Sequence, residues 1–162
     1  MKVIFLDIDG VLNCDSTTNK LFDYDFVDED KIMRLKSIID QTGAKVVLDS
    51  TWRDGWYHWD KGYTTQACEM YIELERELMR HGISLMDKTP MFKGGMSVRG
   101  QEIKYWMEHQ DKEIESFVIL EDWENLWPYN DDNIVWIDGE VGLTDKDVER
   151  AVEILNGNVS DR

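Results

Sequence analysis

The fold is decided by the stretch Val3-Ile4-Phe5-Leu6-Asp7-Ile8-Asp9-Gly10-Val11-Leu12-Asn13. Its first four residues are apolar and include β-branched and aromatic side chains, which predicts a buried strand. The strand ends at Asp7, and Asp9 follows on the same side of an extended chain before Gly10 lets the backbone turn. Because ligands bind at the C-terminal ends of strands in open α/β sheets, this stretch predicts a site with two neighbouring carboxylates.

Two carboxylates this close favour particular kinds of chemistry. Like charges held together raise the pKa of one carboxyl group unless a cation is present. The pair therefore suits a metal site, a pair of groups that transfer protons, or both. The structural alternative is an edge strand that runs into an acidic turn and has no chemical role.

Length and composition limit the class of protein. The chain of 162 residues predicts one domain over 1–162 with a sizeable core. A net charge of −16 disfavours tight binding to long nucleic acids, but it permits a small phosphorylated substrate whose charge a metal offsets. Cys14 and Cys68 lack the spacing of a disulfide framework, which predicts reduced thiols and a cytoplasmic location. No stretch predicts a signal peptide or a membrane span, so no membrane partner is expected, and the oligomeric state stays open.

A helix and a second strand follow the first strand. Residues 13–29 predict a loop or a small flap, after which Asp28 or Asp30 can cap a helix that runs to Thr42. Residues 44–48 predict a second buried strand. A right-handed crossover makes the two strands parallel, so their C-terminal ends lie at the same edge of the sheet.

The second strand ends in Asp49-Ser50-Thr51-Trp52-Arg53. A hydroxyl group beside Asp7 could donate a hydrogen bond to a phosphate oxygen, and Thr51 and Ser50 are the alternatives for it. Arg53 could pair with phosphate through its planar guanidinium. A turn with a surface arginine is the structural alternative. Aromatic residues crowd the next segment, and they could stack a nucleobase or form a packing cluster in a loop over the sheet: Trp52, Trp56, Tyr57, Trp59 and Tyr63.

Periodicity and capping residues predict the rest of the sheet and its helices. The predicted elements are a helix from Thr64 or Thr65 to Gly82, a strand over 83–86, a helix over 98–109 capped by Ser97, strands over 117–120 and 133–137, and a last helix opened by Thr144. Arg99 lies in the first turn of the 98–109 helix, which starts at the C-terminal edge of the sheet and so near Asp7. The fourth strand ends in Glu121-Asp122, which brings further acids to that edge.

Several of these motifs together resemble the haloacid dehalogenase (HAD) superfamily. The string D-I-D-G-V-L-N is similar to its first motif, and V-V-L-D-S-T-W-R resembles the second motif of polynucleotide phosphatase relatives. The string R-G-Q-E-I-K-Y-W resembles the R-x-x-E-I pattern of HAD domains grouped with RNA-repair enzymes. The resemblance covers nearly the whole chain. It implies an α/β, HAD-like (Rossmann-like) fold with a five-stranded parallel sheet, helices on both faces, and little or no cap domain.

The resemblance also implies an activity, that of a Mg²⁺-dependent phosphomonoester hydrolase. Asp7 would attack phosphorus and form an aspartyl-phosphate, and Asp9 would transfer protons. Thr51 and Arg99 would hold the phosphoryl oxygens. Three lysines compete with Arg99 for this role: Lys88, Lys93 and Lys104.

The implied metal ligands come from the first and fourth strands. Mg²⁺ prefers few carboxylates together with water and phosphate oxygens, and Asp7, the carbonyl of Asp9 and Asp122 would supply the protein ligands. Glu121 or Glu124 would support them. The pair Glu121-Asp122 departs from the Asp-Asp that is common in the superfamily, which leaves open which acid contacts the metal.

The expected substrate is a phosphorylated small molecule such as a nucleotide. Gly10, Ser50 and Arg53 are expected to contact it. One alternative is a phosphatase that acts on the 3′ ends of polynucleotides in nucleic-acid repair, which an uncapped, open site favours and the net charge disfavours. The other alternative is a catalytically idle HAD-like binding module, which would have no need of both Asp7 and Asp9.

Overall fold

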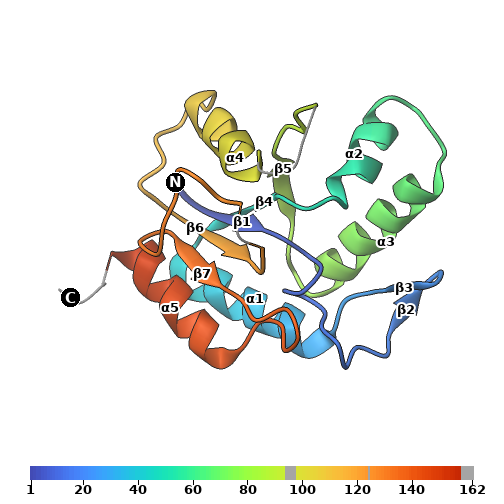
Figure 1. Cartoon of the computed structure of the whole chain (residues 1–162), viewed down its shortest axis with the longest axis horizontal. Helices are drawn as coiled ribbons and strands as arrows, with labels where there is room; N and C mark the ends of the chain where they lie inside the picture. Colours follow the sequence, from blue (N-terminus) through green and yellow to red (C-terminus); the bar gives the residue numbers. More distant parts are fainter. Residues whose placement is uncertain (94–97, 124, 158–162) are drawn as a thin grey trace.

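Five parallel strands form the central sheet of the computed structural model, which describes residues 1–93, 98–123 and 125–157. Their order is β5-β4-β1-β6-β7 (Figure 1). The strands are β1 (Lys2–Leu6), β4 (Lys45–Leu48), β5 (Leu85–Lys88), β6 (Ser116–Glu121) and β7 (Ile134–Trp136). Leu6 at the end of β1 pairs with Leu48 on one side and Leu120 on the other. The residues that follow these three strands therefore emerge side by side.

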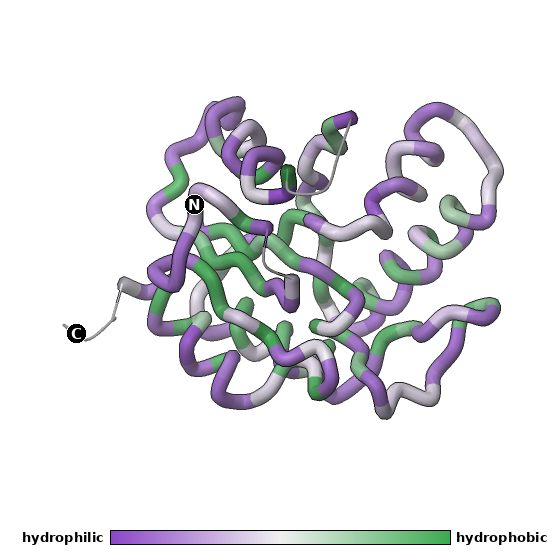
Figure 2. The backbone as a smooth tube through the Cα atoms, viewed as in Figure 1, coloured by the Kyte–Doolittle hydropathy of each residue, from purple (hydrophilic) through white to green (hydrophobic). Residues whose placement is uncertain are grey.

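Helices cover both faces of this sheet, as the sequence predicts. Three of them, α1 (Glu29–Thr42), α3 (Gln66–Arg80) and α5 (Asp145–Asn156), contribute to one hydrophobic cluster with one face of the strands. The other face packs against α4 (Arg99–Glu108). Hydrophobic residues gather on the central strands, and hydrophilic residues dominate the periphery (Figure 2). Burial on both faces explains why the three inner strands, β1, β4 and β6, are nearly continuous apolar runs.

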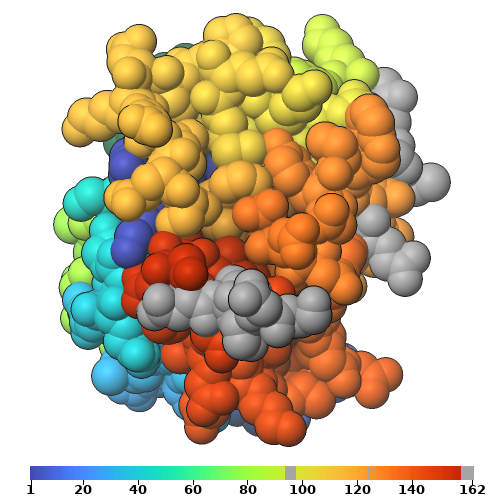
Figure 3. Space-filling view, turned by 90° about the vertical axis from the view of Figure 1, so that its left-hand side faces the viewer, coloured from blue at the N-terminus to red at the C-terminus, as the bar shows by residue number. Residues whose placement is uncertain are grey.

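The outer surface of the sheet's β7 side is formed by segments far apart in the sequence. Figure 3 shows α5 beside α1 and beside the segment that leads into and out of β7, with the region of α4 above them. Arg34 of α1 forms an ion pair with Asp145 of α5, with 3.0 Å between Nε and Oδ1. None of the helices in the described ranges combines the length and the apolar character that crossing a membrane needs.

The boundaries of most predicted elements are confirmed to within two residues. Thr65 caps α3 and Thr144 caps α5, each by accepting a hydrogen bond from a backbone N–H in the first turn. Asp28 occupies the N-cap position of α1, but its carboxylate accepts from Thr17 Oγ1 instead of the helix backbone. The cap predicted at Ser97 lies outside the described residues.

Two insertions shape the C-terminal edge of the sheet. The flap predicted after β1 is a hairpin of β2 (Lys20–Leu21) and β3 (Tyr24–Asp25). The aromatic segment after β4 forms a helix, α2 (Arg53–Asp60), so the predicted loop is wrong, whereas the predicted packing of its aromatic residues is confirmed for Trp52 and Trp56. Trp56 of α2 stacks on Tyr71 of α3 with 5.0 Å between ring centroids. The described ranges contain no separate cap domain beyond these insertions.

Candidate active site

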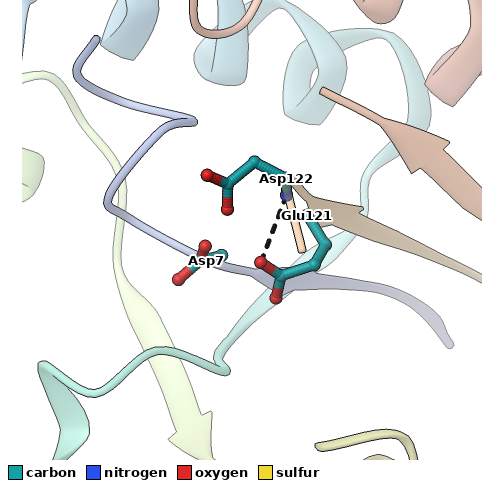
Figure 4. A group of neighbouring side chains, drawn as sticks. All are labelled: Asp7, Glu121 and Asp122. Carbon is teal, nitrogen blue, oxygen red and sulfur yellow. Dashed lines mark hydrogen bonds between the residues drawn. The ribbon is translucent and has the colours of Figure 1, made fainter. Parts of the chain in front are cut away.

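Three carboxyl groups from neighbouring strands meet at the C-terminal edge of the sheet (Figure 4). Asp7 follows β1, Glu121 ends β6 and Asp122 comes next. One oxygen atom from each lies within 4.8 Å of the others, and Asp7 and Glu121 are buried whereas Asp122 is exposed. The backbone N–H of Asp122 donates to Glu121 Oε1 at 3.1 Å, which holds Glu121 in this group. Oxygen ligands at this spacing can hold a divalent cation.

Arg99 is the basic side chain that lies against these acids. Its Nη1 donates to Glu121 Oε2 at 2.8 Å and lies 3.3 Å from Asp7 Oδ1. Burial and the nearby Glu121 raise the pKa of Asp7 well above its usual value, although Arg99 opposes this shift. Burial also raises the pKa of Glu121. The single positive charge of Arg99 does not offset two buried carboxylates and their neighbour Asp122, so an additional positive charge would stabilise the group.

Two glycines make room for Asp122. A Cβ atom at Gly10 would overlap the Asp122 carboxylate, and one at Gly139 would lie 2.7 Å from Asp122 Oδ2. Gly10 also has a φ of +81°, which favours glycine. The acid after β6 therefore reaches the site only because the segments after β1 and β7 carry no side chain at these points. Sequence reasoning gave Gly10 a substrate contact and missed Gly139.

Asp9 stands beside the group of three and outside it. Its exposed carboxylate accepts hydrogen bonds from Asn13 Nδ2 at 3.0 Å and from Trp52 Nε1 at 3.1 Å. These two donors fix the position of the carboxylate at the mouth of the site. Sequence reasoning missed both, although the separation of four residues between Asp9 and Asn13 is a signal for a local hydrogen bond.

A fourth acid, Asp49, lies behind the site and was missed by sequence reasoning. It follows β4 on the sheet face that α4 covers, the face that also carries Asp7 and Glu121. Asp49 is 0% exposed, and Thr89 Oγ1 donates to its Oδ1 at 3.0 Å. Its Oδ2 has no hydrogen-bond partner within the described part of the chain. Burial raises the pKa of Asp49 to about 7, although Arg99 favours its charged form.

The side chains after β4 have different surroundings. Thr51 is exposed and lines a cavity beside Asp9. Ser50 is buried, and its Oγ accepts from the backbone N–H of Trp52 at 3.2 Å. Of the two hydroxyl alternatives, Thr51 is therefore the one that can reach a ligand.

Arg53 does not face this cavity. It is 3% exposed, its Nη2 lies 2.9 Å from Glu102 Oε1, and its Nη1 donates to the carbonyl of Ser50 at 2.8 Å. These contacts join the start of α2 to α4. The contact between Arg53 and substrate stays a prediction, and these contacts disfavour it because the guanidinium is already bound and shielded from solvent.

The lysines that compete with Arg99 have other surroundings. Lys88 pairs with Asp60 at 2.7 Å, and Lys104 lies 3.8 Å from Glu108 on the outside of α4. Lys93 is exposed. Glu124, the possible supporting acid, lies outside the described residues.

A cavity of about 770 Å³ opens next to the acids. Asp9, Thr51 and Asp122 stand where it meets the candidate site. From there it extends between the hairpin β2–β3, the helices α2 and α3, and the segment after β7. It offers space for a small ligand beside the acids.

Comparison with known proteins identifies the family. The family model for the HAD domain in Swiss Army Knife RNA repair proteins matches residues 3–148, which is most of the chain. Searches of curated proteins and of solved structures found no match. The matched range includes most of β1, the acids at the end of β6 and the helix that carries Arg99. The chain therefore belongs to the family of HAD domains found in Swiss Army Knife RNA repair proteins.

Proposed function

We propose that this protein is a Mg²⁺-dependent phosphomonoester hydrolase that acts on a nucleotide or another small phosphoester. Its family supports a hydrolase of the phosphatase type. The observation that carries the proposal is the convergence of Asp7, Glu121, Asp122 and Arg99 at one edge of the sheet. Phosphoryl transfer depends mainly on positioning and on charge stabilisation. This group combines the proposed nucleophile, Asp7, with further carboxylates that can hold a cation and with the positively charged Arg99.

The donor set fits Mg²⁺, which the superfamily generally uses. Asp7 and Asp122 would hold the ion together with the carbonyl of Asp9, and Glu121 would support them. The raised pKa of Asp7 is the property expected of a ligand set that needs further positive charge. When bound, Mg²⁺ offsets the negative charge of the phosphoryl oxygens.

The side chains of the protein would carry out two displacements. Asp7 attacks phosphorus, and the bond between phosphorus and the leaving oxygen breaks while Asp9 donates a proton to that oxygen. Asp9 then takes a proton from a water molecule that attacks the aspartyl-phosphate, which releases phosphate and restores Asp7. Thr51 and Arg99 hold the phosphoryl oxygens. The hydrogen bonds from Asn13 and Trp52, which hold the Asp9 carboxylate in place, would keep it on the leaving-group side.

A second candidate is a phosphatase for the 3′ ends of polynucleotides. The family's description names RNA repair proteins, which favours this candidate. The acids around the cavity disfavour it, because they would repel the phosphates next to the reacting one. A catalytically idle binding module is the third candidate. The two hydrogen-bond donors that hold Asp9 disfavour it, because a module that only binds would not need a positioned group for proton transfer.

Release of inorganic phosphate from 4-nitrophenyl phosphate tests the chemistry. We expect turnover with Mg²⁺, none with EDTA, and a loss of about three orders of magnitude or more in Asp7→Asn, because the amide is not a nucleophile. Asp111→Asn is the matched control, since Asp111 is an exposed acid beyond the far end of α4. Comparable turnover by Asp7→Asn and the wild type would overturn the assignment of the nucleophile.

A further inference from the structure

The cavity lies on the side of the site that the leaving alcohol would occupy. Asp9, the proposed proton donor to the leaving oxygen, stands at the junction between site and cavity. Figure 1 shows the hairpin β2–β3 next to α3, and residues of both line the cavity. If Asp9 has this role, the residues of this cavity would contact the part of the substrate that is released as alcohol.

The charged side chains that line the cavity are all negative. Five acids line it in addition to Asp9 and Asp122, and none of its lining residues is Lys, Arg or His: Asp15, Asp25, Asp54, Asp138 and Glu140. Lys20 pairs with Asp25, and His58 Nε2 lies 3.5 Å from Asp54 Oδ1. Asp15 and Glu140 are exposed and form no ion pair within the described ranges. The negative field of the cavity is thus only partly offset by the protein itself.

Aromatic rings accompany these acids. Tyr24 is 56% exposed and Trp123 is 65% exposed, and both line the cavity together with Trp52. Trp52 is anchored by its indole N–H to Asp9, so its place beside the leaving-group side is fixed. Aromatic faces attract cations, and the attraction to ammonium groups is strongest where carboxylates stand nearby. Acids and rings together recognise a positively charged group that also has apolar surface.

We infer that the site takes small phosphomonoesters whose alcohol part carries a positive charge, such as a substituted ammonium group. This inference rests on the proposed function and adds the substrate class to it. The phosphoryl group would lie at Asp7 and Arg99, where positive charge is available. The alcohol part would lie in the acid-lined cavity, where a cation is attracted and a second phosphate is repelled. The site is therefore matched to a substrate with opposite charges at its two ends.

A pair of esters with the same shape tests the inference. The substrates are 4-(trimethylammonio)phenyl phosphate and 4-tert-butylphenyl phosphate, which differ in charge while their outer groups have the same size. We compare the ratio of their kcat/KM values in the wild type and in Asp15→Asn/Glu140→Gln. Because both esters are measured with both proteins, the difference in their intrinsic reactivity cancels when the two ratios are compared. We expect the preference for the cation to fall by about five-fold in this variant, as two screened charges are removed.

The control variant carries the same chemical changes elsewhere. Asp111→Asn/Glu149→Gln alters two exposed acids outside the cavity, and we expect the preference to stay at the wild-type value. An equal preference in the wild type and in Asp15→Asn/Glu140→Gln would overturn the inference. Turnover of a 3′-phosphorylated dinucleotide with a higher kcat/KM than the cationic ester would overturn it as well.

A binding measurement separates the inference from the proposed function. If neither ester is hydrolysed, the proposed function fails. The charge preference of the cavity is then measured by titrating the two free phenols against the wild type and following tryptophan fluorescence. Tighter binding of the cationic phenol, lost in Asp15→Asn/Glu140→Gln, would support the cavity's selectivity, and equal binding of both phenols would contradict it.

Discussion

Asp49 shows how a single residue links the site to stability. It is fully buried behind the acids, and one of its oxygens has no hydrogen-bond partner within the described ranges. A charged carboxylate in such surroundings is costly, so the folded protein holds the proton up to a pKa of about 7. An unfolded chain releases the same proton near its ordinary value of 3.8. The two states therefore bind different numbers of protons between these pH values.

The substitution Asp49→Asn tests this difference. Between about pH 4 and pH 7 the folded state binds the Asp49 proton and the unfolded state does not, so this group makes the free energy of unfolding fall as the pH rises. The amide does not titrate and can still accept from Thr89. We therefore expect the free energy of unfolding of Asp49→Asn, taken relative to that of the wild type, to increase between pH 5 and pH 8 by about 1 kcal/mol or more. Urea unfolding of both proteins at the two pH values measures it.

The acids near Asp49 titrate in both proteins, but the Asp49 charge itself raises the pKa of Glu121, so the comparison measures Asp49 together with its coupling to them. A constant difference in the free energy of unfolding between pH 5 and pH 8 would contradict the raised pKa. Thr89→Val provides a further check. It removes the hydrogen bond to Asp49 Oδ1, which favours the charged form, and we expect it to make the pH dependence steeper above neutral pH.

At the scale of elements, a buried ion pair joins α2 to α4. Arg53 and Glu102 have side chains that are 3% and 5% exposed, and the backbone N–H of Phe92 donates to the second oxygen of Glu102 at 2.6 Å. Gly55 allows α2 to approach α3 closely, because a Cβ atom there would overlap the carbonyl of Ala67. The helix α2 is therefore held on both sides by tertiary contacts, and its aromatic residues do not need a high helix propensity.

Breaking this pair is expected to destabilise the fold strongly. Glu102→Ala leaves the Arg53 guanidinium buried without its partner, and we expect a loss of about 3–5 kcal/mol in the free energy of unfolding. The double variant Arg53→Met/Glu102→Leu should recover most of it, since two apolar side chains of similar volume replace the pair. Lys104→Ala, which removes an exposed pair on the same helix, is the control and should cost about 1 kcal/mol or less.

The same double variant tests the structural role of Arg53. We expect its KM for 4-nitrophenyl phosphate to stay close to the wild-type value, because Arg53 faces Glu102 and not the cavity. A KM raised by ten-fold or more in a variant that remains folded would instead support a contact between Arg53 and substrate.

At the scale of the whole molecule, negative charge dominates. The chain has 34 acidic and 18 basic residues, with a net charge of −16. Self-repulsion of this size weakens the compact state, and salt screens it. We expect the Tm to rise by roughly 3 °C between 20 mM and 300 mM NaCl. Thermal unfolding followed by circular dichroism, with KCl at the same ionic strength as a control, would show it; a falling Tm would contradict it.

Most of the fold follows from local patterns in the sequence. The apolar runs predict the five strands, and the spacing of apolar residues between them predicts α1, α3, α4 and α5. The crossover rule then makes neighbouring strands parallel, which places Asp7 and the Glu121-Asp122 pair at one edge. The structure adds α2, whose Trp and Tyr residues are weak helix formers and depend on contacts with α3 and α4.

The order of residues along the chain thus specified where the acids come together, because side-chain alternation and strand direction are local properties with long-range consequences. Only the tertiary structure decided which charged groups face them. Arg99 and Arg53 are both predicted from the sequence to lie near the C-terminal edge of the sheet. In the structure, Arg99 lies against Asp7, whereas Arg53 forms a buried ion pair with Glu102. The burial of Asp49 and the negative charge of the cavity likewise depend on how the elements pack together. Partners and solvent exposure depend on which elements pack together, and no local pattern contains that information.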